Sequence, residues 1–297
     1  METSTTIKLP NGFVSKPGRV SGDVWWPAAV PVVAFLAILF VFPTGTLLLK
    51  AFSQFDPPQT GGWDNLVWFL GNEANLTILV RTFVVAAVST LLTALVAFPY
   101  AYVMTIAGAR VRTWMLGAVL VSMLLGILLR NFSWVILLQS NGPVNDILAW
   151  LGLERIRFLG TLSAVLMGMV HVLFPYMVLP LYSVLQAIDR RLLLAAESLG
   201  ATPARAFLQI YLPLALPGLI AGAMLVFVLA LGFYITPAIL GSPQQSLISN
   251  LIYSQFERTA AFGRAGAMAL VLSIAALAVV ALMAKVNRRN RMYGGTP

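Results

Sequence analysis

The chain contains no cysteine and only one histidine, His171, among its 297 residues. The absence of cysteine excludes disulfides, thiolate catalysis and cysteine metal sites, and a lone histidine argues against a histidine-based metal cluster. Charged residues are also scarce, at 10% of the chain against roughly 25% in soluble domains. Hydrophobic residues make up 59%. A soluble protein of this length could not bury that much apolar surface, whereas a lipid bilayer can accommodate it.

Six apolar segments are each long enough to cross a hydrocarbon layer of roughly 30 Å as a helix of about 20 residues. We predict helices in all six, because lipid offers no partner for unpaired backbone groups and the alternating pattern of a β-barrel is absent. The expected fold is therefore all-α, a polytopic membrane protein with about six transmembrane helices. The predicted spans are 27–51, 77–106, 114–138, 161–187, 214–240 and 265–284.

An even number of spans places both termini on one side of the membrane. Basic residues accumulate on the cytoplasmic side of membrane proteins, so we expect both termini to be cytoplasmic. The first 26 residues do not look like a cleaved signal peptide. We therefore predict an N-terminal tail (1–26), a transmembrane domain (27–284) and a basic C-terminal tail (285–297). The basic residues on this side, which flank apolar segments and so argue against nucleic-acid binding, are Lys8, Lys16, Arg19, Arg110, Arg112, Arg190, Arg191, Arg205, Lys285, Arg288, Arg289 and Arg291.

A long, mostly polar segment, residues 189–213, lies between the fourth and fifth spans on the same side. Asp189 is expected to cap a first short helix, and Gly200 to end it, because glycine enters the left-handed conformation without a Cβ clash. Thr202 is expected to cap a second helix that Pro213 stops. The spacing alone leaves two interpretations open, a helix–turn–helix that docks a partner and an amphipathic helix at the membrane surface.

Residues 189–213 resemble the cytoplasmic signature loop of ABC importer permeases, which reads Glu-Ala-Ala, three residues, Gly, nine residues, Ile-x-Leu-Pro. The matching residues at that spacing are Ala195, Ala196, Gly200, Ile210, Leu212 and Pro213. The family glutamate falls on Leu194, and Glu197, nearly one helical turn away, is the candidate substitute. The resemblance implies that this segment, here called the coupling loop, contacts a partner ATPase through Leu194, Ala195, Ala196, Glu197, Gly200, Ala201 and Arg205.

A second stretch resembles the spermidine/putrescine-type branch of these permeases. It comprises Leu-Arg-Asn-Phe-Ser-Trp-Val-Ile-Leu-Leu at 129–138, Asn-Gly-Pro-Val-Asn at 141–145 and Leu-Gly-Leu at 151–153. That branch also imports other small amino-bearing or charged solutes. The resemblance therefore implies a small solute that is polyamine-like or another amino-bearing compound.

Several further properties follow from the resemblance. It implies the type I ABC importer transmembrane-domain fold in a bacterial inner membrane. Transport would require an ATPase subunit dimer, a second related permease in a heterodimer, and a periplasmic or extracellular solute-binding protein. ATP and Mg would bind the partner ATPase, because this chain has no phosphate-binding loop. The chain is thus expected to be no enzyme itself and to hold no cofactor.

Two other functional classes compete with an importer subunit. A stand-alone secondary transporter of a small solute would be expected to carry inverted internal repeats or ionisable residues at mid-membrane, and neither is evident. A membrane scaffold or sensor would need an appended soluble domain, and the tails are short for one.

Polar residues inside the predicted spans are candidates for a translocation path or gate, because they are costly in hydrocarbon unless they serve a purpose. Arg130 could line the path or extend to the lipid head groups. His171 could form an inter-helix hydrogen bond or contact the solute, and Tyr234 could stack on an amine or pack at a kink. The predicted spans contain no Asp or Glu, which argues against a polycation and leaves a carboxylate- or phosphonate-bearing solute open. The candidates are Arg130, Asn131, Trp134, His171 and Tyr234.

Overall fold

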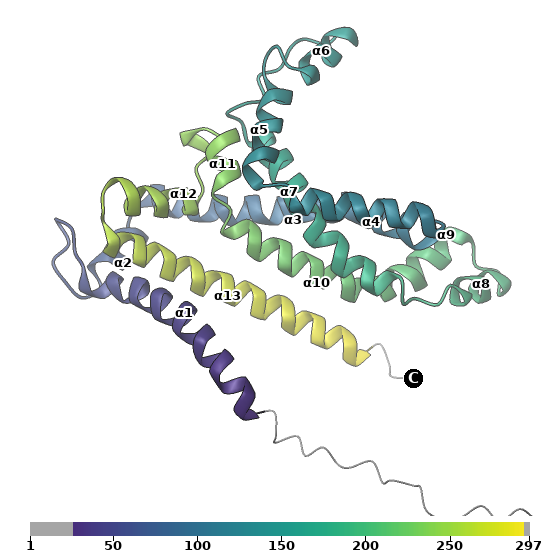
Figure 1. Cartoon of the computed structure of the whole chain (residues 1–297), viewed down its shortest axis with the longest axis horizontal. Coiled ribbons are helices and arrows are strands. Elements are labelled where there is room, and N and C mark those ends of the chain that lie inside the picture. Colours follow the sequence, from purple (N-terminus) through teal and green to yellow (C-terminus); the bar gives the residue numbers. More distant parts are fainter. Residues whose placement is uncertain (1–25, 294–297) are drawn as a thin grey trace, which may run out of the picture. The chain divides into compact units, whose positions relative to one another are not determined.

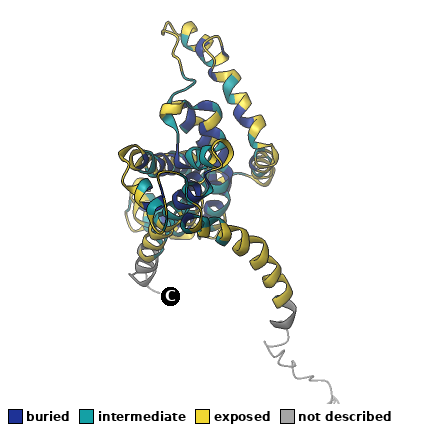
Figure 2. Cartoon of the chain, turned by 90° about the vertical axis from the view of Figure 1, so that its left-hand side faces the viewer, coloured by how far each residue is buried: buried dark blue, intermediate teal, exposed yellow. Residues whose placement is uncertain are grey.

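The computed structural model describes residues 26–293, with side chains described over residues 29–285. All but the last residue of the predicted N-terminal tail, and residues 294–297 of the C-terminal tail, lie outside this range. The chain divides into two compact units, Met1–Leu47 and Leu48–Pro297. Most of helix α1 (Trp26–Ser53) belongs to the first unit, and its side chains over residues 30–44 are exposed, as Figure 2 shows. An apolar helix with an exposed apolar surface is what lipid or a partner helix requires.

The described residues of the second unit form helices joined by turns and loops, without strands (Figure 1). Over the described residues, five helices are long and apolar enough to cross a membrane, and a bent pair makes a sixth if it is one span. The expected all-α fold is confirmed. The helices after α1 are α2 (Asp64–Leu70), α3 (Glu73–Ile106), α4 (Ala109–Leu124), α5 (Ile127–Leu138), α6 (Pro143–Trp150), α7 (Leu162–Leu185), α8 (Arg191–Ser198), α9 (Pro203–Ala206), η1 (Phe207–Tyr211), α10 (Leu212–Leu231), α11 (Ile235–Leu240), η2 (Pro243–Gln245), α12 (Ile248–Tyr253), η3 (Ser254–Arg258) and α13 (Phe262–Tyr293).

Helices α3, α7 and α10 pack against one another and enclose the main core (Figure 1). Small residues let α10 approach α7 closely, which is the usual basis of helix packing in membranes. A Cβ atom on Gly218 would lie 2.7 Å from Cβ of Val184, and one on Gly222 would lie 2.7 Å from Sδ of Met177. These two glycines therefore set the distance between the helices that carry the core.

The predicted third span, 114–138, is wrong as a single straight helix. Helices α4 and α5 meet at an angle of 98°. The break falls at Leu125 and Gly126, which have extended backbone. Glycine is a poor helix former in a helix interior and offers no side chain to pack there. The bend turns α5 away from the direction of α4, and it brings α5 against α7 and α11.

The predicted end of the second short helix at Pro213 is also wrong. The predicted fifth span, 214–240, is present, but its helix begins earlier, at Pro203, and ends at Leu231. One continuous helix of 29 residues runs from Pro203 to Leu231, through the π-helical turn η1. The ring of Pro213 would clash with the carbonyl four residues earlier in a regular α-helix, and a wider π turn just before it relieves that clash. The helix then ends at Gly232, and α11 begins after the predicted interruption at Tyr234.

Helix α13 extends nine residues beyond the predicted last span, to Tyr293. Near its start, the guanidinium of Arg264 donates hydrogen bonds to the side chain of Gln59 and to the carbonyl of Pro57, and it lies 4.9 Å from the ring centre of Trp68. Arg264 thereby ties the loop before α2 to the last long helix. The same end of this unit carries α12.

The contact between α7 and α10 can be tested with Gly218→Val. The branched side chain would overlap Val184, and overpacking of this kind costs about 1–3 kcal/mol. We expect a lower midpoint of thermal unfolding in detergent, followed by fluorescence-detected size-exclusion chromatography. The control is Gly117→Val in α4, where an added Cβ has no neighbour within 4 Å. Equal stability of the two variants would contradict the close approach.

Candidate functional site

The coupling loop has the predicted capping residues. A carboxylate oxygen of Asp189 accepts a hydrogen bond from the backbone N–H of Arg191 at 2.9 Å, at the start of α8. Gly200 has a φ of +92°, in the left-handed region that glycine adopts without strain. The hydroxyl oxygen of Thr202 accepts from the N–H of Arg205 at 3.4 Å. The turn between α8 and α9 is therefore defined by local backbone chemistry rather than by packing against the spans.

Helix α8 presents exposed apolar side chains, while Leu193 is half-buried against the main core. None of its residues is buried. Leu194 is 61% exposed and Leu199, at its end, is 89% exposed. Ala195, Glu197, Gly200 and Arg205 are also exposed, whereas Ala196 and Ala201 are half-buried.

One hydrogen bond connects the start of this exposed helix to the core helices. The guanidinium of Arg190 donates to the hydroxyl of Thr105 near the end of α3, at 3.0 Å. At the other side of the loop, η1 packs by stacking of Phe207 on Tyr211, with ring centres 5.4 Å apart, and Tyr211 is buried. The coupling loop is thus connected to α3 by this hydrogen bond and continues through η1 into α10.

Four of the five path or gate candidates lie together where α5 meets α7. Arg130 is 5% exposed, and its guanidinium donates to the carbonyl of Val172 at 3.4 Å. Trp134 Nε1 donates to Nδ1 of His171 at 3.0 Å, so the expected inter-helix hydrogen bond of His171 is present. Because Arg130 is enclosed by helices, the expectation that it extends to the head groups is wrong.

Buried polar atoms without partners gather at the same junction. Asn131 and Thr236 are fully buried, and neither the side-chain carbonyl of Asn131 nor the hydroxyl of Thr236 has a hydrogen-bond partner. Both side chains lie next to Gly168 of α7. A Cβ atom added to Gly168 would lie 3.5 Å from Oδ1 of Asn131 and 2.8 Å from Cγ2 of Thr236. An unsatisfied buried polar group is destabilising, so such groups persist mainly where they serve a function. The junction of α5, α7 and α11 therefore combines buried polar side chains with hydrogen-bonding atoms that have no partner.

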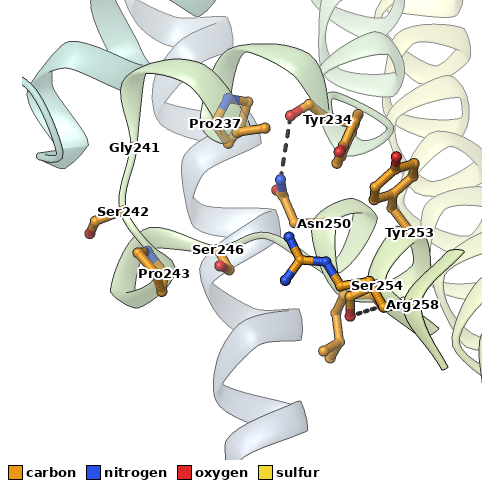
Figure 3. A pocket seen from close by; sticks show the side chains of 12 residues that line it. Tyr234, Pro237, Gly241, Ser242, Pro243, Ser246, Asn250, Tyr253, Ser254 and Arg258 are labelled. Atoms are coloured by element: carbon orange, nitrogen blue, oxygen red, sulfur yellow. Dashed lines mark hydrogen bonds between the residues drawn. The ribbon is translucent and has the colours of Figure 1, made fainter.

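Tyr234 lies apart from this cluster, in the turn after α10. Its ring stands 4.5 Å from the ring of Tyr253, measured between centres. Together with Asn250 and Arg258, these residues line a cavity of about 290 Å³ (Figure 3). The sequence signalled Tyr234, but nothing in the spacing of Tyr253, Asn250 or Arg258 indicated that they would join it.

The conformation of the segment 141–145 is fixed by hydrogen bonds of the Asn145 side chain to the flanking backbone. Asn145 is fully buried, and its amide donates to the carbonyls of Gln139 and Ile156, both at 3.0 Å, while its side-chain carbonyl accepts from the N–H of Ile156 at 2.8 Å. An added Cβ on Gly142 would lie 2.6 Å from a backbone carbonyl oxygen. Asn145 and Gly142 therefore shape the connection between α5 and α7, and Asn145 is not available to a partner.

A family model described as "Binding-protein-dependent transport system inner membrane component" matches residues 8–292. The chain belongs to this family. It is a multi-pass inner membrane protein and the permease component of an ABC importer, in which ATP hydrolysis is carried out by a partner.

The permease is similar to two proteins of Escherichia coli (strain K12). The "Spermidine/putrescine transport system permease protein PotB" is 31% identical over 261 residues, which cover 84% of this chain and 94% of PotB. The "Inner membrane ABC transporter permease protein YdcU" is 31% identical over 268 residues, 81% of this chain and 85% of YdcU. Both similarities extend over most of each chain, so they concern the whole permease and not only the coupling loop.

The fold also has a match among solved structures. A chain of a bacterial alginate ABC transporter, in complex with an alginate pentasaccharide-bound periplasmic protein, superposes with a TM-score of 0.74, at 20% identity, over 89% of this chain and 94% of that chain. The permease therefore has the expected type I importer transmembrane-domain fold.

The role of Asn145 can be tested with Asn145→Ala. The substitution removes three hydrogen bonds and leaves the backbone N–H and carbonyl of Ile156 without the Asn145 side chain as their partner, at a cost of about 1–3 kcal/mol. We expect a clearly lower thermal midpoint in detergent. The control is Asn141→Ala, since Asn141 is exposed and has one side-chain bond, to Arg155. An unchanged midpoint for Asn145→Ala would contradict the structural role.

Proposed function

We propose that this permease forms half of the translocation path for a small amino-bearing solute, with a related permease as the other half. A solute-binding protein would deliver the solute on the side of α12, and an ATPase dimer would act from the side of α8. The helix from Pro203 to Leu231 would span about 43 Å at 1.5 Å per residue, so it connects these two ends directly.

The observation that carries the proposal is the exposed apolar surface of α8. Leu192, Leu194 and Leu199 are all exposed on this short helix and its end, and clustered exposed apolar side chains support contact with a partner. We assign that partner as the ATPase, because the residues that the signature-loop motif identifies are on this helix and its turn. Leu194 and Glu197 lie three residues apart on α8 and are both exposed, which supports Glu197 as the proposed substitute for the family glutamate.

The coupling loop would transmit motion through two connections. A shift of α8 would be passed through Arg190 to α3 and through η1 to α10. A π turn is often found at functional sites in helices, and here it lies between α9 and α10 within one continuous helix. We propose that nucleotide-driven movement of the loops of the two permeases switches the path between inward-open and outward-open states, as a rigid-body change. We also propose that both termini lie in the cytoplasm, on the same side of the membrane as α8.

The solute class is proposed from the relatives and from the buried cluster. PotB carries the name of a spermidine and putrescine transporter, which favours an amino-bearing solute. Arg130, Asn131, Trp134 and His171, at the junction of α5 and α7, are the proposed gate or path residues. Tyr234 is the proposed contact nearer the side of the binding protein.

Affinity purification tests the subunit composition. The tagged permease, extracted from its native membrane in mild detergent, is expected to retain an ATPase subunit and a second permease, identified by mass spectrometry. ATPase activity of the isolated complex should rise when the loaded binding protein is added. Isolation of the chain alone, with uptake into liposomes that needs no ATP, would instead show a secondary transporter.

Two substitutions test the coupling loop. Ala196→Asp would place a charge at the proposed contact, and Gly200→Val would strain a turn whose φ is +92°. We expect both to lower solute uptake about tenfold or more while ATP hydrolysis continues, because a misplaced or charged contact removes 1.4 kcal/mol or more. The variants should still be inserted in the membrane. Ser198→Ala, on the same exposed helix, is the control, and normal uptake in the two variants would contradict the assignment.

A further inference from the structure

The cavity at the turn after α10 has the composition of a binding site for a polar solute. It has a volume of about 290 Å³, roughly that of ten waters in the liquid. Its lining combines two aromatic rings, an amide, serine hydroxyls and one guanidinium, contributed by Tyr234, Tyr253, Asn250, Ser246, Ser254 and Arg258. Figure 3 shows these side chains around one space between α11 and the segment that follows η2.

Arg258 is the charged group of this cavity. It is exposed, at the end of η3, and it donates no hydrogen bond to another described residue. Over the part of the chain whose side chains are described, the single ion pair joins Arg155 and Asp146, so the neighbouring Glu257 does not pair with Arg258. An arginine fork with unused donors fits a carboxylate in a bidentate manner.

The tyrosine pair favours a cation, whereas Arg258 favours an anion. The rings of Tyr234 and Tyr253 are tilted by 34°, and the amide of Asn250 donates to the backbone carbonyl of Tyr234 at 3.4 Å. This bond orients Asn250 towards the turn that carries the first ring. The face of a tyrosine attracts an ammonium group, and a methylene chain packs well against it. One wall of the cavity thus suits a cation, and Arg258 suits an anion.

The helices that carry the proposed path residues have a buried positive charge and no negative charge. Helices α5, α7, α10 and α11 contain no Asp or Glu. Arg130 lies buried between α5 and α7 with its Nε unpartnered. A doubly or triply charged cation would find no counter-charge on these helices, whereas a carboxylate would find one.

We propose that this cavity binds a small solute that carries a carboxylate and an ammonium group, with the carboxylate on Arg258 and the ammonium on the tyrosine pair. The inference rests on the proposed function and narrows its solute class from amino-bearing compounds to zwitterionic ones. A carboxylate side chain of the binding protein would offer Arg258 the same chemistry, and the test separates the two sources.

Protection of Arg258 from phenylglyoxal tests the site without relying on uptake. The whole complex in nanodiscs is treated with phenylglyoxal, and modification of Arg258 is followed by peptide mass spectrometry. The probes are three four-carbon compounds at equal ionic strength: butanoate, 4-aminobutanoate and putrescine. We expect 4-aminobutanoate to protect at about tenfold lower concentration than butanoate, since the ammonium adds a cation–π contact, and putrescine to give no protection. Arg157, also exposed, serves as the internal control.

Variants at Tyr253 distinguish the contact between the ammonium group and the aromatic ring from a general effect of substitution on the cavity. In Tyr253→Phe the aromatic face remains, so protection by 4-aminobutanoate should be retained. In Tyr253→Ala the concentration of 4-aminobutanoate for half-protection should rise to about that of butanoate.

Protection by putrescine, or no protection by 4-aminobutanoate, would overturn the proposal. So would protection by the solute-free binding protein alone, because that would assign Arg258 to a protein contact. If the complex retains the ATPase while the protection assay fails, the proposed function stands and only the solute-site inference is overturned. Loss of the ATPase would count against the proposed function itself.

Discussion

The whole permease depends on one constraint, that backbone N–H and C=O groups inside a bilayer must be satisfied within the protein. This requirement makes each span a helix and makes every interruption of a helix an exception. The interruptions here occur at Leu125 and Gly126 and at Gly232. Each lies next to residues with an assigned or proposed role. The breaks in the helices, more than the helices themselves, position the chemistry.

The two ends of the helix from Pro203 to Leu231 carry different kinds of surface. The end near α8 presents leucines with no partner, which fits contact with a protein. The opposite end opens into a polar cavity that contains Arg258, which fits contact with a small charged solute. Between them, Gly218 and Gly222 hold the helix against α7. A rigid element with distinct binding surfaces at its two ends is well suited to couple events on opposite sides of a membrane.

The unpaired polar atoms at the junction of α5, α7 and α11 bear on the stability of this arrangement of the core. Asn131 and Thr236 leave hydrogen-bonding atoms unpaired at the junction of α5, α7 and α11. A fully satisfied core would favour one state strongly, whereas unpaired groups lower the stability of this arrangement relative to any in which they find partners. A transporter that alternates between two states requires such a balance, with a difference of only a few kcal/mol between them.

The amino-acid order was enough to predict the all-α membrane fold, the capped turn of the coupling loop and the polar residues of α5. These follow from local rules, namely the length of apolar segments, the chemistry of Asp189, Gly200 and Thr202, and the scarcity of polar residues in lipid. It could not predict the 98° bend at Gly126, because glycine is also common within straight membrane helices. Nor could it group Tyr234 with Tyr253 and Arg258, whose proximity arises where α11, α12 and η3 fold back together. Such contacts between distant segments depend on packing, which a local pattern does not encode.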